Sequence, residues 1–175
     1  AGKSALSQTR GNATPLRKEG GDRSSFTNVT FDEIEIGKSL SVSRAVTRND
    51  VEALTFVSGD IDEAHVEAEE VPGHVPSTES VAAEAFFSYL LNRRLPGPGT
   101  TILAHDLRFE GRIVMGESYT ATITAKEKRT EGKVIVFDCQ CANQAGEVIA
   151  SGTATVAAPT KRISYTDIAT PEVIF

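Results

Sequence analysis

The most constraining stretch of this sequence is residues 77–94, which read STESVAAEAFFSYLLNRR. Apolar side chains cover most of the helical circumference, and only Ser80, Glu84 and Ser88 form a polar stripe at i, i+4 and i+8. A helix that is apolar nearly all round is a buried helix. Other elements of the chain must therefore surround this helix on most sides.

Strand-like runs follow the predicted helix, and turn-like sequences separate them. The runs are Thr101–Phe109, Glu117–Lys128, Lys133–Asn143 and Glu147–Ala157, and the separators are Gly116, residues 130–132 and residues 143–146. Because these connections are short, we expect neighbouring strands to be antiparallel. The pattern predicts an α+β fold in which a four-strand meander forms an antiparallel curved sheet, wrapped round one long central helix.

The composition suits one globular domain and excludes several classes of protein. The chain has 175 residues, 39% of them hydrophobic, and a net charge of -6, which argues against a nucleic-acid partner. No apolar run is long enough for a membrane-spanning helix. Cys139 and Cys141 are expected on one face of a strand as free thiols, so a reducing compartment is favoured and a zinc site is not.

The chain divides into three segments. Residues 1–25 are rich in basic side chains and lack apolar periodicity, which indicates a disordered leader or an expression remnant; a transit peptide is the alternative. Residues 26–158 form the predicted domain. Residues 159–175 show no clear period and are interpreted as a C-terminal tail or linker.

The stretch at residues 58–66, SGDIDEAHV, contains the most reactive side-chain types outside the predicted elements. It follows a short predicted helix that begins at Thr47, has Asp50 at the capping-box spacing and ends at Gly59. Asp60 and His65 are compatible with an acid–base pair, with a charged turn, or, together with Asp62 and Glu63, with a hard-cation site. An EF-hand is not supported, because the loop lacks the required glycine.

Two further histidines are weaker candidates. His74 lies in a predicted loop, where a solvated histidine is the default interpretation. His105 lies in the run ILAHDLRF, and we expect it on the face opposite Leu103 and Leu107, in a satisfied structural or interface role.

Taken with the motifs SGD…H, LPGPGT, HDLRF and MGE, the predicted helix and sheet resemble the MaoC-like dehydratases, a hotdog-fold family that includes the (R)-specific enoyl-CoA hydratases. The likeness covers residues 26–158 and is strongest to hotdog domains fused to phosphate acyltransferases. In the family motif S-G-D-x-N-P-x-H the Asp and His are catalytic, and they match Asp60 and His65. The resemblance implies a homodimer, an acyl-CoA thioester substrate and a fused or associated phosphate acyltransferase.

The sequence departs from the family pattern at the start of the central helix. The family's A-H-G-M falls on residues 78–81, so that Glu79 and Ser80 replace the His-Gly pair. By resemblance, Ser80 and Val81 supply the oxyanion and substrate-binding positions, while Asp62, Glu63 and Glu79 are possible modulators. A carboxylate at Glu79 and a Cβ at Ser80 disfavour enolate stabilisation by the helix N-terminus.

These observations predict an (R)-specific enoyl-CoA hydratase-type lyase that adds water to trans-2-enoyl-CoA with Asp60 and His65, without cofactor or metal, in the cytoplasm. Two alternatives stay open. The first is a catalytically degenerate hotdog module that binds acyl-CoA or dimerises. The second is a hotdog thioesterase.

Overall fold

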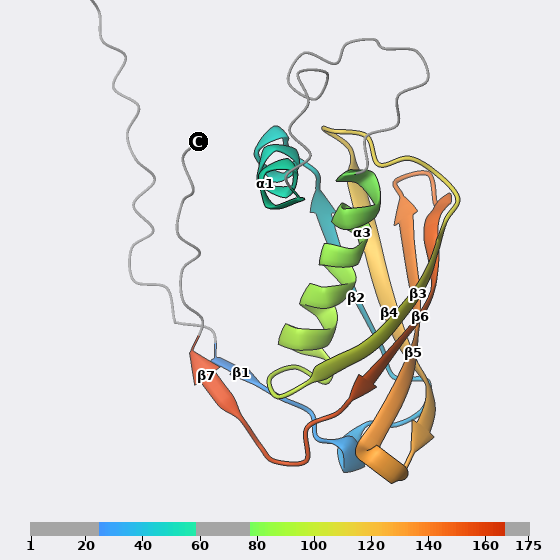
Figure 1. Ribbon diagram of the computed structural model, residues 1–175. Helices are drawn as coiled ribbons and strands as arrows, with labels where there is room; N and C mark the ends of the chain where they lie inside the picture. Colours follow the sequence, from blue (N-terminus) through green and yellow to red (C-terminus); the bar gives the residue numbers. More distant parts are fainter. Residues whose placement is uncertain (1–24, 59–77, 167–175) are drawn as a thin grey trace, which may run out of the picture.

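A computed structural model describes residues 25–58 and 78–166 of the chain. Five antiparallel strands, in the order β2-β4-β5-β6-β3, curve round the helix α3 (Figure 1). Their bounds are β2 Ser39–Ala45, β3 Thr101–Phe109, β4 Ser118–Arg129, β5 Val134–Asn143 and β6 Val148–Ala157, and the helices are α1 Arg48–Ser58 and α3 Thr78–Tyr89. The predicted hotdog fold, with an antiparallel curved sheet round a central helix, is confirmed.

The four predicted strand runs are present, each within one residue of its expected bounds. The turns fall where glycine permits a positive φ: Gly132 has φ 69° between β4 and β5, and Gly146 has φ 81° between β5 and β6. Alternation also places Cys139 and Cys141 in the core, as expected, while Gln140 between them is exposed.

The predicted four-strand meander is wrong in its first strand. β3 pairs with β6, whereas β4 pairs with β2 and β5, so only β4, β5 and β6 form a meander. Residues 110–117 carry the chain across the end of the sheet. They begin beside β6, where the Glu110 N–H donates to the Ile149 carbonyl (2.8 Å), and end beside β2, where the Gly116 N–H donates to the Val46 carbonyl (2.8 Å).

The helix α3 supplies much of the core. Ala83, Phe87, Leu90 and Leu91 are fully buried against the sheet, together with strand residues such as Phe137. The predicted helix at residues 77–94 continues past α3 as a π-helical turn at Leu90–Arg94, so the chain stays helical to the expected end. Ala85 and Tyr89 remain exposed, which shows that one flank of α3 is less covered than the sheet side.

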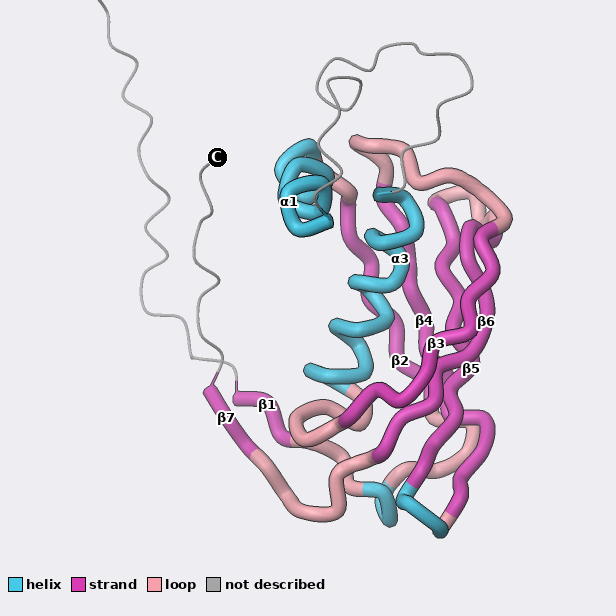
Figure 2. The backbone as a smooth tube through the Cα atoms, viewed as in Figure 1, coloured by secondary structure: helices cyan, strands magenta, loops and turns pink. Residues whose placement is uncertain are grey.

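A small second sheet closes the end of the molecule away from the start of α3 (Figure 2). Its strands are β1 Ser25–Thr27 and β7 Ser164–Thr166, from opposite ends of the described chain. Buried Asn28 joins them: its Nδ2 donates to the carbonyls of Pro98 (2.9 Å) and Lys161 (2.8 Å), and its Oδ1 accepts from the Ile163 N–H (2.9 Å). Residues 159–166 are therefore packed against the domain, although the sequence indicated a tail or linker; the domain boundaries themselves stay predictions.

Within the described residues, none of the helices is both long and apolar enough to cross a membrane.

Candidate active site

The predicted catalytic residues Asp60 and His65, with Asp62 and Glu63, lie outside the described residues, as does His74. The segment that contains them joins the end of α1, at Ser58, to the start of α3, at Thr78. The end of α1 and the start of α3 are therefore the two described points to which the segment of Asp60 and His65 is attached.

A complete capping box fixes the start of α1, as the sequence predicted. The Asp50 carboxylate accepts from the Thr47 N–H (2.9 Å) and hydroxyl (2.7 Å), and the Asp50 N–H donates to Thr47 Oγ1 (3.2 Å). A capping box satisfies backbone donors at the helix start that otherwise lack a partner. The box therefore determines where α1 begins. The segment of Asp60 and His65 follows the other end of this helix, at Ser58.

The predicted oxyanion positions lie in the first turn of α3. In a helix that begins at Thr78, the N–H groups up to Ser80 have no acceptor within the helix, and the Val81 N–H is the first to have one. Ser80 is therefore the better placed of the two as a backbone donor. The partial positive charge at a helix N-terminus favours a developing negative charge there. The side chains of Glu79 and Ser80 are outside what the structure describes, whereas Val81 is half-buried.

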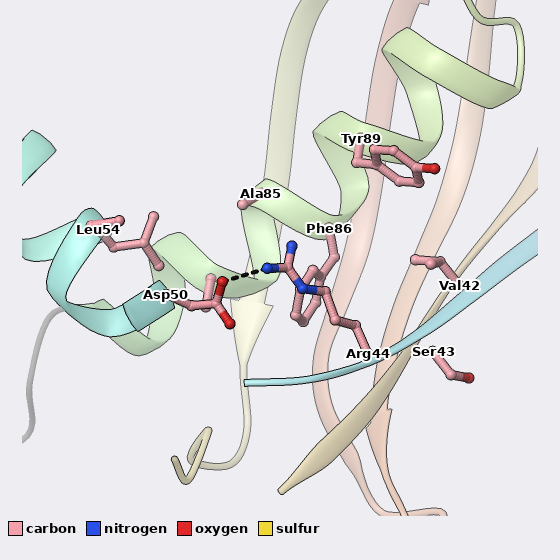
Figure 3. A pocket seen from close by; sticks show the side chains of 10 residues that line it. Val42, Ser43, Arg44, Asp50, Leu54, Ala85, Phe86 and Tyr89 are labelled. Carbon is pink, nitrogen blue, oxygen red and sulfur yellow. Dashed lines mark hydrogen bonds and ion pairs between the residues drawn. The ribbon is translucent and has the colours of Figure 1, made fainter. Parts of the chain in front are cut away.

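A pocket of about 440 Å³ lies between α1, α3 and β2, and we call it the α1–α3 pocket (Figure 3). Apolar side chains form its body, among them Leu54 from α1, Phe86 from α3 and Val42 from β2. Arg44 of β2 reaches toward α1 and forms an ion pair with Asp50. The pocket thus combines an apolar interior with a charged pair at one edge, as small-molecule sites do.

His105 is a candidate that the sequence analysis misplaced. It pairs with fully buried Ala154 and so lies on the inner face of β3. Leu107, two positions on, shares that face, so the expected placement opposite Leu107 was wrong. A bulge between Ile102 and Ala104 leaves Leu103 exposed and away from His105, as expected for that leucine. Among the described residues, His105 Nε2 is buried and has no hydrogen-bond partner, so the expected satisfied role is not observed.

Among the described residues, the groups with clearly shifted pKa values do not line the α1–α3 pocket, although Tyr119 pairs with Arg44 across β2 and β4. Burial raises the pKa of Cys139 to about 12 and that of Cys141 to about 11, and hydrogen bonds from Thr30 lower the pKa of exposed Glu33 to about 2. Burial also raises the pKa of Tyr119, whose hydroxyl accepts from the Val114 N–H (2.6 Å). Cys139, Cys141 and Tyr119 are packed in the core, and Glu33 caps a short helix. Their pKa shifts therefore have structural causes.

No family model matches the chain. It is 31% identical over 134 residues to an (R)-specific enoyl-CoA hydratase of Rhodospirillum rubrum, a match that covers 75% of this chain and 92% of the relative. The chain belongs to the (R)-specific enoyl-CoA hydratase family. A second relative in the same range of coverage, at 24% identity over 135 residues, is a 3-hydroxybutyryl-CoA dehydratase of Methylorubrum extorquens; the match covers 75% of this chain and 85% of that one.

Solved structures of this hydratase family share the fold. The unliganded R-hydratase PhaJ1 of Pseudomonas aeruginosa aligns with a TM-score of 0.79 at 24% identity, over 87% of this chain and 99% of that one. The (R)-hydratase of Aeromonas caviae aligns with a TM-score of 0.66 at 24% identity, over 72% and 98%. The MaoC-like resemblance predicted from the sequence is thereby confirmed.

Proposed function

We propose that this chain is a hydro-lyase that adds water to trans-2-enoyl-CoA thioesters, and that Asp60 and His65 are its catalytic pair. The observation that carries the proposal is the 31% identity to an (R)-specific enoyl-CoA hydratase over most of both chains. The residues Ser58-Gly59-Asp60 and His65 stand at the spacing of the family motif, directly after α1.

The chemistry needs a base, an acid and donors for the enolate. In the proposed reaction, Asp60 takes a proton from a water molecule that His65 orients, and the water oxygen bonds to the β-carbon as the C=C π bond breaks. The π electrons form an enolate of the thioester, and the proton taken by Asp60 passes through His65 to the α-carbon, so Asp60 is again a carboxylate and the product has gained one hydroxyl and one hydrogen. Positioned proton transfer of this kind is worth roughly 10²–10⁴ in rate.

The start of α3 is proposed to stabilise the enolate through its free backbone N–H groups. Ser80 supplies a donor of this kind, and the positive end of the helix dipole adds to it. Glu79 opposes this role when ionised. Its carboxylate belongs to the residue next to Ser80, the proposed donor to the enolate, and like charges repel. Asp62 and Glu63 lie within three positions of Asp60 in the sequence and are proposed to modulate it through their negative charge.

We further propose a homodimer formed through β3. Within the described sheet β3 pairs only with β6, so its other edge has unpaired backbone groups, and Leu103 and Phe109 are exposed along it. Pairing β3 with the same strand of a second copy satisfies this edge. A role in fatty acid metabolism, a cytoplasmic location and a fused or associated phosphate acyltransferase stay predictions of the sequence.

The second candidate function is a degenerate module that binds acyl-CoA without turning it over. Glu79 and Ser80, in place of the family's His-Gly, are the observation that favours it. Both candidates predict a dimer, and they differ only in chemistry.

One assay separates the two functions. Purified chain is mixed with crotonyl-CoA, and the loss of conjugated-thioester absorbance is followed beside an Asp60→Asn variant. Turnover by the parent and its loss in the variant support hydration. Acyl-CoA binding without turnover contradicts hydration and leaves the module; in that case the double substitution Glu79→His and Ser80→Gly tests whether these two residues are the cause.

A further inference from the structure

The α1–α3 pocket exists because small side chains face each other across it. Ala53 of α1 and Ala82 and Ala85 of α3 line it, and alanine does not reach across the space between two helices. The volume of about 440 Å³ falls within the ~300–1,000 Å³ that is usual for small-molecule sites. Leu54 and Phe86 complete an apolar body.

The pocket lies on the flank of α3 that is opposite the polar stripe. Of its α3 lining residues, Ala82, Phe86 and Tyr89 follow one another at i, i+4 and i+7, and Ala85 lies between them, so that all four fall within roughly 100° round the helix axis. At 3.6 residues per turn, Ser80 and Glu84 are each roughly half a turn away from Ala82. A ligand in the pocket therefore contacts a different side of α3 from the side that bears Ser80 and Glu84.

Arg44 and Asp50 form an ion pair at the edge of the pocket, and Arg44 has donors to spare. Its guanidinium has five N–H donors, and one nitrogen is paired with Asp50. The Asp50 carboxylate also accepts both Thr47 bonds of the capping box, so it is held in place by α1 and fixes Arg44 at the pocket edge. The Arg44 side chain is 58% exposed, so a ligand oxygen can reach the remaining donors.

We propose that the α1–α3 pocket binds a free medium-chain aliphatic carboxylic acid. The carboxylate bonds to Arg44, and the chain lies among Ala53, Ala82 and Ala85. From Ala82 to Tyr89 the helix rises ~10 Å, which matches roughly eight carbon atoms in an extended chain with bonds of ~1.5 Å. The far end of a thioester's acyl tail has no polar group for Arg44, and this favours a free acid. The inference goes beyond the proposed hydration, whose steps are assigned to Asp60, His65 and the start of α3 and not to the lining residues of the pocket.

Octanoate is the test ligand, and octan-1-ol is its uncharged counterpart. Binding is measured by calorimetry, and the site is located from shifts of the alanine methyl resonances. We expect saturable binding at one site per chain, with octanoate tighter than octan-1-ol. Arg44→Gln raises the Kd of octanoate about tenfold, as loss of a charge-assisted hydrogen bond does. The same variant leaves the Kd of octan-1-ol unchanged.

Two further variants complete the design. Ala85→Trp fills the pocket from an exposed position and abolishes binding of both ligands. Arg48→Gln is the matched control, because Arg48 is an exposed arginine of α1 that pairs with Glu52 and does not line the pocket. It leaves octanoate binding unchanged.

Three results overturn the proposal: no saturable octanoate binding, binding that Arg44→Gln and Ala85→Trp leave intact, or an Ala85→Trp variant that loses turnover of trans-2-decenoyl-CoA but keeps that of crotonyl-CoA. The last result assigns the pocket to the tail of the substrate. The binding measurements do not need turnover, so failure of the hydratase assay leaves them valid and the two proposals are judged separately.

Discussion

The helix α3 has two unlike neighbours. Toward the sheet it presents Ala83 and Phe87, and the π-helical turn that follows adds Leu91; all three are fully buried among strand side chains. Toward α1 it presents Ala82, Ala85 and Tyr89, which leave the α1–α3 pocket between the helices. The same helix thus packs into the core on one side and lines a cavity on the other. The difference depends on whether its side chains are large enough to fill the space that they face.

The largest expected effect is the loss of Phe87. Phe87→Ala removes a side chain that is 0% exposed, and it lowers the free energy of unfolding by about 3–5 kcal/mol, because a closed cavity is left behind. Phe86→Ala is the matched variant on the pocket side and costs about 1.5–3 kcal/mol, since its space merges with an existing pocket. Urea unfolding of both proteins checks this; equal losses contradict the contrast between the two sides.

Enlarging alanines tests the same contrast in the opposite direction. Ala83→Leu forces extra atoms into a filled interface and costs about 1–3 kcal/mol. Ala85→Leu extends into the pocket and changes the free energy of unfolding by no more than ~0.5 kcal/mol. Thermal unfolding of the two variants is the measurement. A severe loss in Ala85→Leu shows that the pocket side is as tightly packed as the sheet side.

Removing the cap of α1 weakens the outer wall of the pocket. Thr47→Ala deletes the hydroxyl that bonds to the Asp50 N–H and carboxylate, and we expect a loss of about 1 kcal/mol. Because the pocket separates part of α1 from α3, the amides of α1 should exchange with solvent faster while those of α3 stay protected. Thr130→Ala is the control, since the Thr130 side chain makes no capping bond.

Thiol labelling provides the mildest comparison. Cys139 and Cys141 are buried on the sheet side, and burial raises the pKa of both thiols to about 12 and about 11, so at pH 8 they remain protonated and covered. A disulfide reagent should therefore label neither in the folded protein and both after unfolding. An Ala85→Cys variant should be labelled rapidly at its added thiol, and slow labelling there contradicts an open pocket.

Much of the fold follows from local pattern. Gly132 and Gly146 mark the turns of the β4-β5-β6 meander, and alternation orients Cys139 and Cys141 correctly, because turn chemistry and the two-residue period are local properties. The partner of β3 was not predictable in this way. Residues 110–117 are short enough for a hairpin, yet they cross the sheet end because β2 and β5 occupy both edges of β4.

In the candidate site, too, local sequence motifs were predictable, whereas arrangements of distant segments were not. Asp60 and His65 match the Asp and His of the family motif, although Asp62 and Glu63 replace the Asn and Pro between them, and whether the two side chains meet stays a prediction. The α1–α3 pocket was missed, since Arg44, Ala53 and Ala85 lie in separate segments with no shared motif. His105 carried a usable signal, because it stands two positions from Leu107 and the pair therefore share a face; only the bulge near Leu103 needed the structure.

The sequence by itself determined the family, the central helix, the four strands that follow it and the capping box of Thr47 and Asp50, because each depends on residues near one another in the chain. The tertiary structure decided the order of the strands, the side of α3 that stays open and the partner of Arg44. These depend on which surfaces are brought into contact when distant segments pack. At such a contact, large side chains such as phenylalanine fill the core, whereas small ones such as alanine leave a pocket.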